Sequence, residues 1–221
     1  ILALLIMILA VPVIIPAENS PDLSGCEMII DDFAQGIKPE WETRSFAGPT
    51  EYTWTREGGK GYIRATSRGT ASGMYYKIEF DPQQYPYITW QWKVDNIISG
   101  GDVSQKSTDD YGARFYIVFP GFFFWQTRAI NYIWANKLPL GQAVHSPYTS
   151  NNIMISVQSG SGNTGRWLSE TRNIYDDYRR YFGRKPPKVG AIAIMTDTDN
   201  TGESASAGYG TIAVCSRDPR K

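Results

Sequence analysis

Residues 89–94 read TWQWKV, and the alternation in this stretch decides the fold class. Successive side chains of an extended chain point to opposite faces, so Trp90 and Trp92 share one face while Gln91 and Lys93 share the other. This pattern predicts a β-strand whose apolar face packs against a second layer. A second interpretation leaves the two indole rings on an open sheet face, where they would stack on a bound sugar.

A second stretch, YGARFYIVF at residues 111–119, repeats this period of two, with its large apolar residues on one face and Arg114 on the other. Short strands separated by Gly and Pro turn signals, with little helix between them, predict an all-β fold, an antiparallel β-sandwich or jelly roll. Residues 128–136 fit either a strand or a helix. The other expected strands lie at residues 28–33, 51–57, 61–67, 73–80, 87–95, 152–160, 188–196 and 209–216.

One short helix is expected near residues 173–182, where apolar and aromatic residues recur on a single helical face. Asn173 is a suitable N-cap, and Gly183 is placed to end the helix. Asp176 and Arg180 have the i,i+4 spacing of a helical ion pair. The charged residues of this helix are therefore expected to form a solvated face.

The first fifteen residues, ILALLIMILAVPVII, are uniformly apolar. They are shorter than the roughly 20 residues of a membrane span and match the apolar region of a secretory signal. A buried core helix is the alternative, which Pro12 disfavours. We expect an export signal at residues 1–17, a linker at 18–27 and a single β-sandwich domain at 28–218. The protein would be exported, periplasmic or associated with the cell envelope, with no transmembrane span after signal removal.

The two cysteines, Cys26 and Cys215, bracket the expected domain. A disulfide between them would close nearly the whole chain into one loop, as suits an exported protein. A lipid anchor at Cys26 is a second interpretation, because residues 23–26 (LSGC) resemble a bacterial lipoprotein box, although a polar segment separates it from the apolar run. Two free thiols are the third.

Charge excludes one class of partner. The chain has 22 basic and 22 acidic residues, so no overall positive field exists to hold a phosphate backbone, and nucleic acid is not expected as a partner. Aromatic residues are abundant, at 14% of the chain. Most belong in a sandwich core, but rings left on an open sheet face suit the flat face of a sugar.

An apolar strand ends in the polar sequence TDTDNTG at residues 196–202. Three interpretations fit these residues. They build a tight turn through their own side chains, they contact a polar ligand directly, or they bind calcium. The spacing matches only the first half of an EF-hand loop, whose twelfth position here is Gly208. We expect no required cofactor, with calcium as the candidate metal. The residues concerned are Asp197, Asp199 and Thr201 for calcium, and Asp197, Asp199 and Asn200 for a ligand.

A second acidic group, Asp102, Asp109 and Asp110, precedes the strand that carries Arg114. One interpretation is a buried ion pair between Arg114 and an aspartate of either acidic loop. The other is a ligand site in which these groups hold sugar hydroxyls or a uronate carboxylate through bidentate bonds. Both interpretations require the loop that carries Asp109 and Asp110 and the loop that carries Asp197 and Asp199 to meet beside Arg114. His145, the single histidine, is more typical of a surface or hydrogen-bonded residue than of a catalytic base, and it remains a ligand candidate.

Several blocks follow one another in a recognisable order: WQWKV, DDYGARFYIVF, INYIWAN, RNIYDDYRRYFG and AIAIMTDTDNT. In this order the chain resembles the exported bacterial family catalogued as domain of unknown function 3047, over roughly residues 29–214. The DDYGARFY and TDTDNT blocks are the most specific part of the match. The resemblance implies an exported single domain and assigns no activity and no catalytic residue.

The sequence contains no Gly-x-Ser-x-Gly elbow, HExxH helix, CxxC pair or phosphate-binding loop. Catalytic residues are therefore unassigned, and an enzyme is not the leading hypothesis. That hypothesis is an exported protein that binds a carbohydrate or another polar polymer. The first alternative is a hydrolase or lyase that uses a pair of these carboxylates. The second is a structural or interaction protein of the envelope without a small-molecule site.

Overall fold

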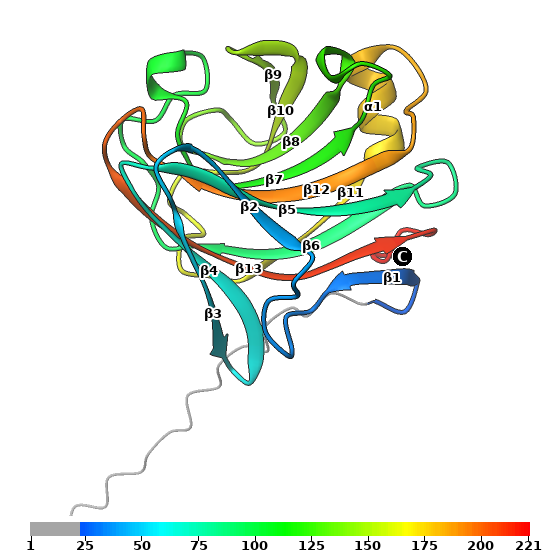
Figure 1. The fold of residues 1–221 in the computed structure, drawn as a ribbon, viewed down its shortest axis with the longest axis horizontal. Helices are drawn as coiled ribbons and strands as arrows, with labels where there is room; N and C mark the ends of the chain where they lie inside the picture. Colours follow the sequence, from blue (N-terminus) through cyan, green and yellow to red (C-terminus); the bar gives the residue numbers. More distant parts are fainter. Residues whose placement is uncertain (1–22) are drawn as a thin grey trace, which may run out of the picture.

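The strands form two β-sheets that pack face to face, as Figure 1 shows, and the buried side chains of the strands form the core between them. The structure is a computed structural model that describes residues 23–221. The predicted export signal and the first part of the predicted linker lie outside the described residues. The all-β sandwich with one short helix is confirmed.

The first sheet has the order β11-β6-β13-β4-β3, and β1 also pairs with β13. The second sheet has the order β2-β5-β12-β7-β8-β10-β9. The β8–β10 pair is parallel, so the second sheet is mixed rather than purely antiparallel. The first sheet comprises β1 (Cys26–Asp31), β3 (Glu51–Glu57), β4 (Lys60–Arg68), β6 (Tyr87–Val94), β11 (Leu168–Asn173) and β13 (Ser204–Cys215). The second comprises β2 (Trp41–Ala47), β5 (Ala71–Phe80), β7 (Tyr111–Phe119), β8 (Arg128–Ala135), β9 (Ala143–Ser146), β10 (Thr149–Ser159) and β12 (Val189–Asp197).

Strands β2, β9 and β11 were not predicted from the sequence, and residues 128–136, which fitted either structure, form strand β8. The missed strands lie at or near sheet edges, where few residues need to be apolar. β2, for example, is exposed along almost its whole length. An apolar period of two therefore does not develop in such strands.

The core between the sheets is built on the rings of β6. Trp90 and Trp92 are fully buried, and Trp90 stacks on Phe115 of β7 with ring centroids 4.6 Å apart. The predicted alternation of β6 is therefore confirmed. The hypothesis that these two indoles stack on a ligand is wrong, because the apolar face of β6 is the face that meets the second sheet.

Helix α1 (Ile174–Phe182) begins and ends where the sequence predicts. The Asn173 side chain accepts a hydrogen bond from the backbone N–H of Asp176 at 3.0 Å, and Gly183 ends the helix with a φ of 68°. The expectation that all charged residues of the helix are solvated is wrong for Asp177. This buried carboxylate accepts bonds from Arg172 and from the Tyr132 hydroxyl, and so ties the helix to both sheets.

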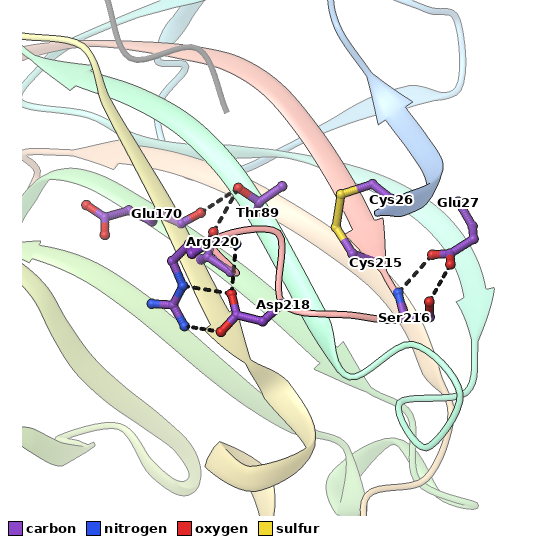
Figure 2. The surroundings of a disulfide bond; sticks show 9 residues. Cys26, Glu27, Thr89, Glu170, Cys215, Ser216, Asp218 and Arg220 are labelled. Atoms are coloured by element: carbon purple, nitrogen blue, oxygen red, sulfur yellow. Dashed lines mark hydrogen bonds and ion pairs between the residues drawn. A yellow bond between two sulfur atoms is a disulfide. The ribbon is translucent and has the colours of Figure 1, made fainter. Parts of the chain in front are cut away.

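A disulfide joins Cys26 of β1 to Cys215 of β13, which pair directly across the two antiparallel strands (Figure 2). The predicted bridge is confirmed, and the chain has no free cysteine among its described residues. A lipid anchor at Cys26 would need this sulfur to be free, so the two alternatives exclude each other. Glu27 supports the junction, because its carboxylate accepts the backbone N–H of Ser216 at 2.8 Å. No helix in the described part of the chain is long and apolar enough to cross a membrane.

We expect replacement of Cys26 and Cys215 by Ser to lower the free energy of unfolding by about 2–5 kcal/mol, because the bridge closes a loop of 189 residues and restricts the unfolded chain. Urea unfolding of both proteins, with and without reductant, measures this difference. Reductant should destabilise only the wild type. Equal stability of the wild type and the double variant in oxidising buffer would contradict the prediction.

Candidate ligand-binding cleft

Arg114 is the centre of a buried polar group on the outer face of the second sheet. Its Nη2 atom donates to Asp197 Oδ2 at 2.6 Å and also contacts Asp109, through the backbone carbonyl and through Oδ2 at 3.5 Å. Its Nη1 atom donates to the Tyr116 hydroxyl at 3.0 Å. The guanidinium lies 3.9 Å from the centre of the Tyr111 ring. The buried ion pair that the sequence offered as one interpretation is therefore present.

Tyr209 supports this arrangement from the opposite sheet. The Tyr209 side chain crosses the core from β13 and donates to the carbonyl of Met195 in β12 at 2.6 Å. The Tyr209 hydroxyl oxygen also accepts the backbone N–H of Arg114 in β7 at 3.4 Å. One phenol thus links β7 at Arg114 to β12 at Met195, two residues before Asp197.

Asp110 joins the two acidic loops. Its carboxylate accepts the backbone N–H groups of Asn200 at 3.2 Å and of Thr201 at 2.6 Å. Glu203 makes a second link, because it accepts the N–H groups of Ser99 at 3.1 Å and of Gly100 at 2.7 Å. The loop that follows β6 and the loop that follows β12 are therefore fastened to each other.

Negative charge exceeds positive charge at this junction. Asp110, Asp197 and Asp199 each bring a carboxylate oxygen within 4.8 Å of the other two, and Asp109 contacts the same Nη2 atom of Arg114 as Asp197 does. Burial raises the pKa of Asp197, Arg114 opposes this effect and the neighbouring aspartates add to it, so that the resulting pKa is about 8. Burial and Asp110 also raise the pKa of Asp199.

A cleft of about 350 Å³ opens above this group. Its walls combine oxygen-bearing and amide side chains with two exposed rings, since Phe46 is 62% exposed and Tyr148 is 57% exposed. A concave site with a few convergent polar groups is typical of ligand binding, and the volume falls in the usual range. The polar side chains that line it are Asp109, Arg114, Tyr116, Ser146, Tyr148, Thr149, Asn152, Asp197, Asp199 and Asn200.

Three buried polar atoms of this cleft have no hydrogen-bond partner within the described part of the protein. They are Arg114 Nε, Asn152 Oδ1 and Asp197 Oδ1, and all three belong to residues that line the cleft. Leaving a buried donor or acceptor unpaired costs about 1–3 kcal/mol. Stability alone does not explain three such atoms in one place, which is a feature expected of a binding site.

The structure brings most of the predicted site residues together. Asp109, Arg114, Asp197, Asp199 and Asn200 line the cleft, and Asp110 holds the loop that carries two of them. The other predicted residues do not line the cleft. Trp90 and Trp92 are in the core, and His145 is exposed on β9. Asp102 accepts hydrogen bonds from Ser104 in its own turn, and the Thr201 hydroxyl accepts the backbone N–H of Glu203.

Sequence reasoning missed Phe46, Tyr116, Tyr148 and Asn152. Tyr116 carried a usable signal, because it lies two residues after Arg114 on the same strand face. The other three come from β2 and from the β9–β10 hairpin. Their place beside β7 and β12 depends on strand order, which a single sequence does not reveal.

The chain belongs to the family described as "Protein of unknown function (DUF3047)", whose model matches residues 39–213, and the family expected from the sequence is confirmed. No curated protein matches the chain. Among solved structures, it is similar to the cellulose induced protein Cip1, with a TM-score of 0.48 and 9% identity over 85% of this chain and 96% of that one.

It is also similar to the family 11 carbohydrate-binding module of the cellulosomal cellulase Lic26A-Cel5E of Clostridium thermocellum. That TM-score is 0.46, with 12% identity over 85% of this chain and 93% of the module. At these identities and TM-scores the likenesses carry no argument about what this chain binds.

The raised pKa of Asp197 predicts a pH effect on stability. Because the pKa in the folded state, about 8, exceeds the ordinary value of 3.8, the folded protein holds a proton that the unfolded chain releases between these limits. The stability that this group contributes is therefore complete at acid pH and is lost as the pH rises toward 8.

Urea unfolding at pH 5 and pH 8, in chelator, measures the effect. The free energy of unfolding of the wild type should fall over this interval relative to that of Asp197→Asn, which keeps a hydrogen-bonding side chain but cannot ionise. The exposed helical variant Asp176→Asn serves as the control and should follow the wild type. Parallel curves for the wild type and Asp197→Asn would contradict the prediction.

Proposed function

We propose that this protein is an exported carbohydrate-binding β-sandwich, located in the periplasm or at the cell envelope, that holds a neutral polysaccharide in the Arg114 cleft. The observation that carries the proposal is the set of unpartnered buried polar atoms among the residues of one cleft. The Cys26–Cys215 bridge supports export, because disulfides persist in oxidising compartments.

Hydroxyl groups are the ligand chemistry that fits this lining. Arg114 Nε is a donor and Asn152 Oδ1 is an acceptor, and a hydroxyl both donates and accepts. Phe46 and Tyr148 supply exposed ring faces at the same cleft, where a pyranose ring can pack its C–H face. A polyol with one apolar face, such as a sugar, matches both kinds of contact.

The charge of the cleft distinguishes between neutral and acidic sugars as ligands. Asp197, Asp109 and Tyr116 already occupy the terminal nitrogens of Arg114, so the guanidinium is not free to form the bidentate bond that would hold a uronate. Even with Asp197 protonated, the carboxylates of Asp109, Asp110 and Asp199 outnumber the Arg114 guanidinium, and like charges repel. The uronate ligand considered from the sequence is therefore disfavoured, and a neutral polymer is favoured.

Calcium is the ion that we propose for the acidic group, with Asp110 in place of the Thr201 predicted from the sequence. Asp110, Asp199 and, after loss of its proton, Asp197 would supply the hard oxygen donors that calcium prefers. Asp197 is only 3% exposed, and its Oδ1 atom has no partner among the described residues. A cation here would offset the excess of carboxylates and stiffen the rim of the cleft.

Affinity electrophoresis tests the carbohydrate proposal. A panel of neutral polymers (a β-glucan, a xylan and a galactomannan) is compared with a polyuronate. We expect retardation by at least one neutral polymer and none by the polyuronate. Phe46→Ala and Tyr148→Ala should each lower the affinity roughly tenfold, because packing of a sugar ring on an aromatic ring contributes on the order of 1 kcal/mol or more.

Leu140→Ala, which removes an exposed apolar side chain outside the cleft, is the matched control and should bind like the wild type. Absence of retardation by every neutral polymer, or unchanged binding in both ring variants, would overturn the proposal. Release of reducing ends or unsaturated products from a retarding polymer, lost in Asp199→Asn, would instead support the hydrolase or lyase alternative.

Thermal unfolding tests the calcium proposal. We expect calcium to raise the melting temperature of the chelator-treated protein, because an ion that binds only the folded state stabilises it. Asp199→Asn should remove this increase, and Asp176→Asn should not. A melting temperature that is indifferent to both chelator and calcium would remove the ion from the proposal and leave the carbohydrate site untouched.

A further inference from the structure

The loop that joins β7 to β8 exposes four consecutive aromatic residues at its tip. Phe122 is 89% exposed, Phe124 83%, Trp125 59% and Phe123 46%. Large apolar side chains gathered in this way on a protein surface mark an interaction site more often than chance exposure does. These four residues, 122–125, are called the aromatic tip below.

The aromatic tip is held in place by its own polar groups. Gln126 accepts the backbone N–H of Phe123 at 3.2 Å, and Asn151 of β10 donates to the carbonyl of Trp125 at 2.8 Å. A turn of 3-10 helix at Phe124–Gln126 completes the loop. One polar atom of each side-chain amide nearest the rings is thus engaged in shaping the loop.

The orientation of the rings also disfavours a sugar platform. Phe122 stands at 89° to Phe123, and Phe124 stands at 81° to Trp125, so the planes of the two most exposed rings are nearly perpendicular to the stacked pair formed by Phe123 and Trp125. A pyranose ring needs one flat face. The apolar interior of a bilayer receives rings in any orientation.

Basic residues surround the aromatic tip. Arg128, Arg184 and Lys185 line the same hollow as Phe122 and Trp125, and no acidic residue lines it. Arg184 and Lys185 are exposed and form no ion pair within the described part of the chain. Figure 1 shows that the loop after β7 and helix α1, whose last turn adds Arg179 and Arg180, stand at the same end of the molecule.

We propose that the aromatic tip and its basic surround form a docking surface for a bilayer that contains anionic phospholipid. Phe122 and Phe124 would enter the region between headgroups and acyl chains, Trp125 would lie at the interface, and the cations would contact the headgroups. Aromatic insertion combined with positive charge is the pairing that gives reversible binding to anionic membranes. This surface adjoins the Arg114 cleft, because Thr149 and Asn152 line both the cleft and a hollow beside Phe124 and Trp125. The bilayer proposal does not depend on the function proposed for the cleft.

Co-sedimentation with vesicles tests the proposal, using phosphatidylcholine alone and phosphatidylcholine mixed with phosphatidylglycerol. We expect the wild type to bind the mixed vesicles and to bind the zwitterionic ones much more weakly. Phe122→Ser combined with Phe124→Ser should weaken binding to the mixed vesicles at least tenfold, because two exposed rings lose their apolar burial. Both positions are exposed, so melting temperatures should match those of the wild type.

Arg184→Ala combined with Lys185→Ala should weaken binding to the mixed vesicles roughly tenfold, and added salt should reduce the difference. Leu140→Ala is the control for an exposed apolar residue elsewhere and should not change vesicle binding. Failure of the wild type to bind mixed vesicles, or unchanged binding in the double Phe variant, would overturn the proposal.

Two further outcomes would also overturn it and would identify another occupant. A dimer in gel filtration that the double Phe variant converts to a monomer would assign the aromatic tip to a second copy of the chain. Loss of retardation by a neutral polymer in the same variant, without vesicle binding by the wild type, would assign it to the glycan surface.

Discussion

A guanidinium held out of water by two carboxylates sets the geometry of the functional end of this protein. Arg114 and Asp197 project from adjacent strands, β7 and β12, and Asp109 contacts the same guanidinium nitrogen as Asp197. Removing one member of such a buried pair leaves a charge without its partner, which typically costs 3–5 kcal/mol. The ends of both strands and the loops that follow them are therefore constrained by one interaction, and the cleft inherits its shape from that constraint.

The distribution of charge divides the molecule into two unlike ends. Carboxylates dominate where β7 begins, beside Arg114, whereas cations and exposed rings gather where β7 ends, beside α1. The formal net charge of zero conceals this division. If the aromatic tip meets an anionic surface, repulsion of the acidic group around Asp197 by that surface would help to orient the protein.

Much of the fold follows from local pattern, and much of the site does not. The alternation at residues 89–94 identified β6 and its two faces, but it could not say which face meets the second sheet, so Trp90 was also considered as a ligand contact. The convergence of Asp109 and Asp197 on Arg114 was expected because an arginine that is buried on a strand needs carboxylate partners. Phe46 and Asn152 were missed because strand order, including the parallel β8–β10 pair, is a long-range property.

The link made by Asp110 has a thermodynamic consequence. Its carboxylate fastens two backbone amides of the facing loop, and Glu203 fastens two more in the reverse direction. Both loops are thereby ordered before any ligand arrives, and their conformational entropy has already been lost during folding. A guest that enters the cleft encounters a preorganised rim, so that little of its binding energy is consumed in ordering the host.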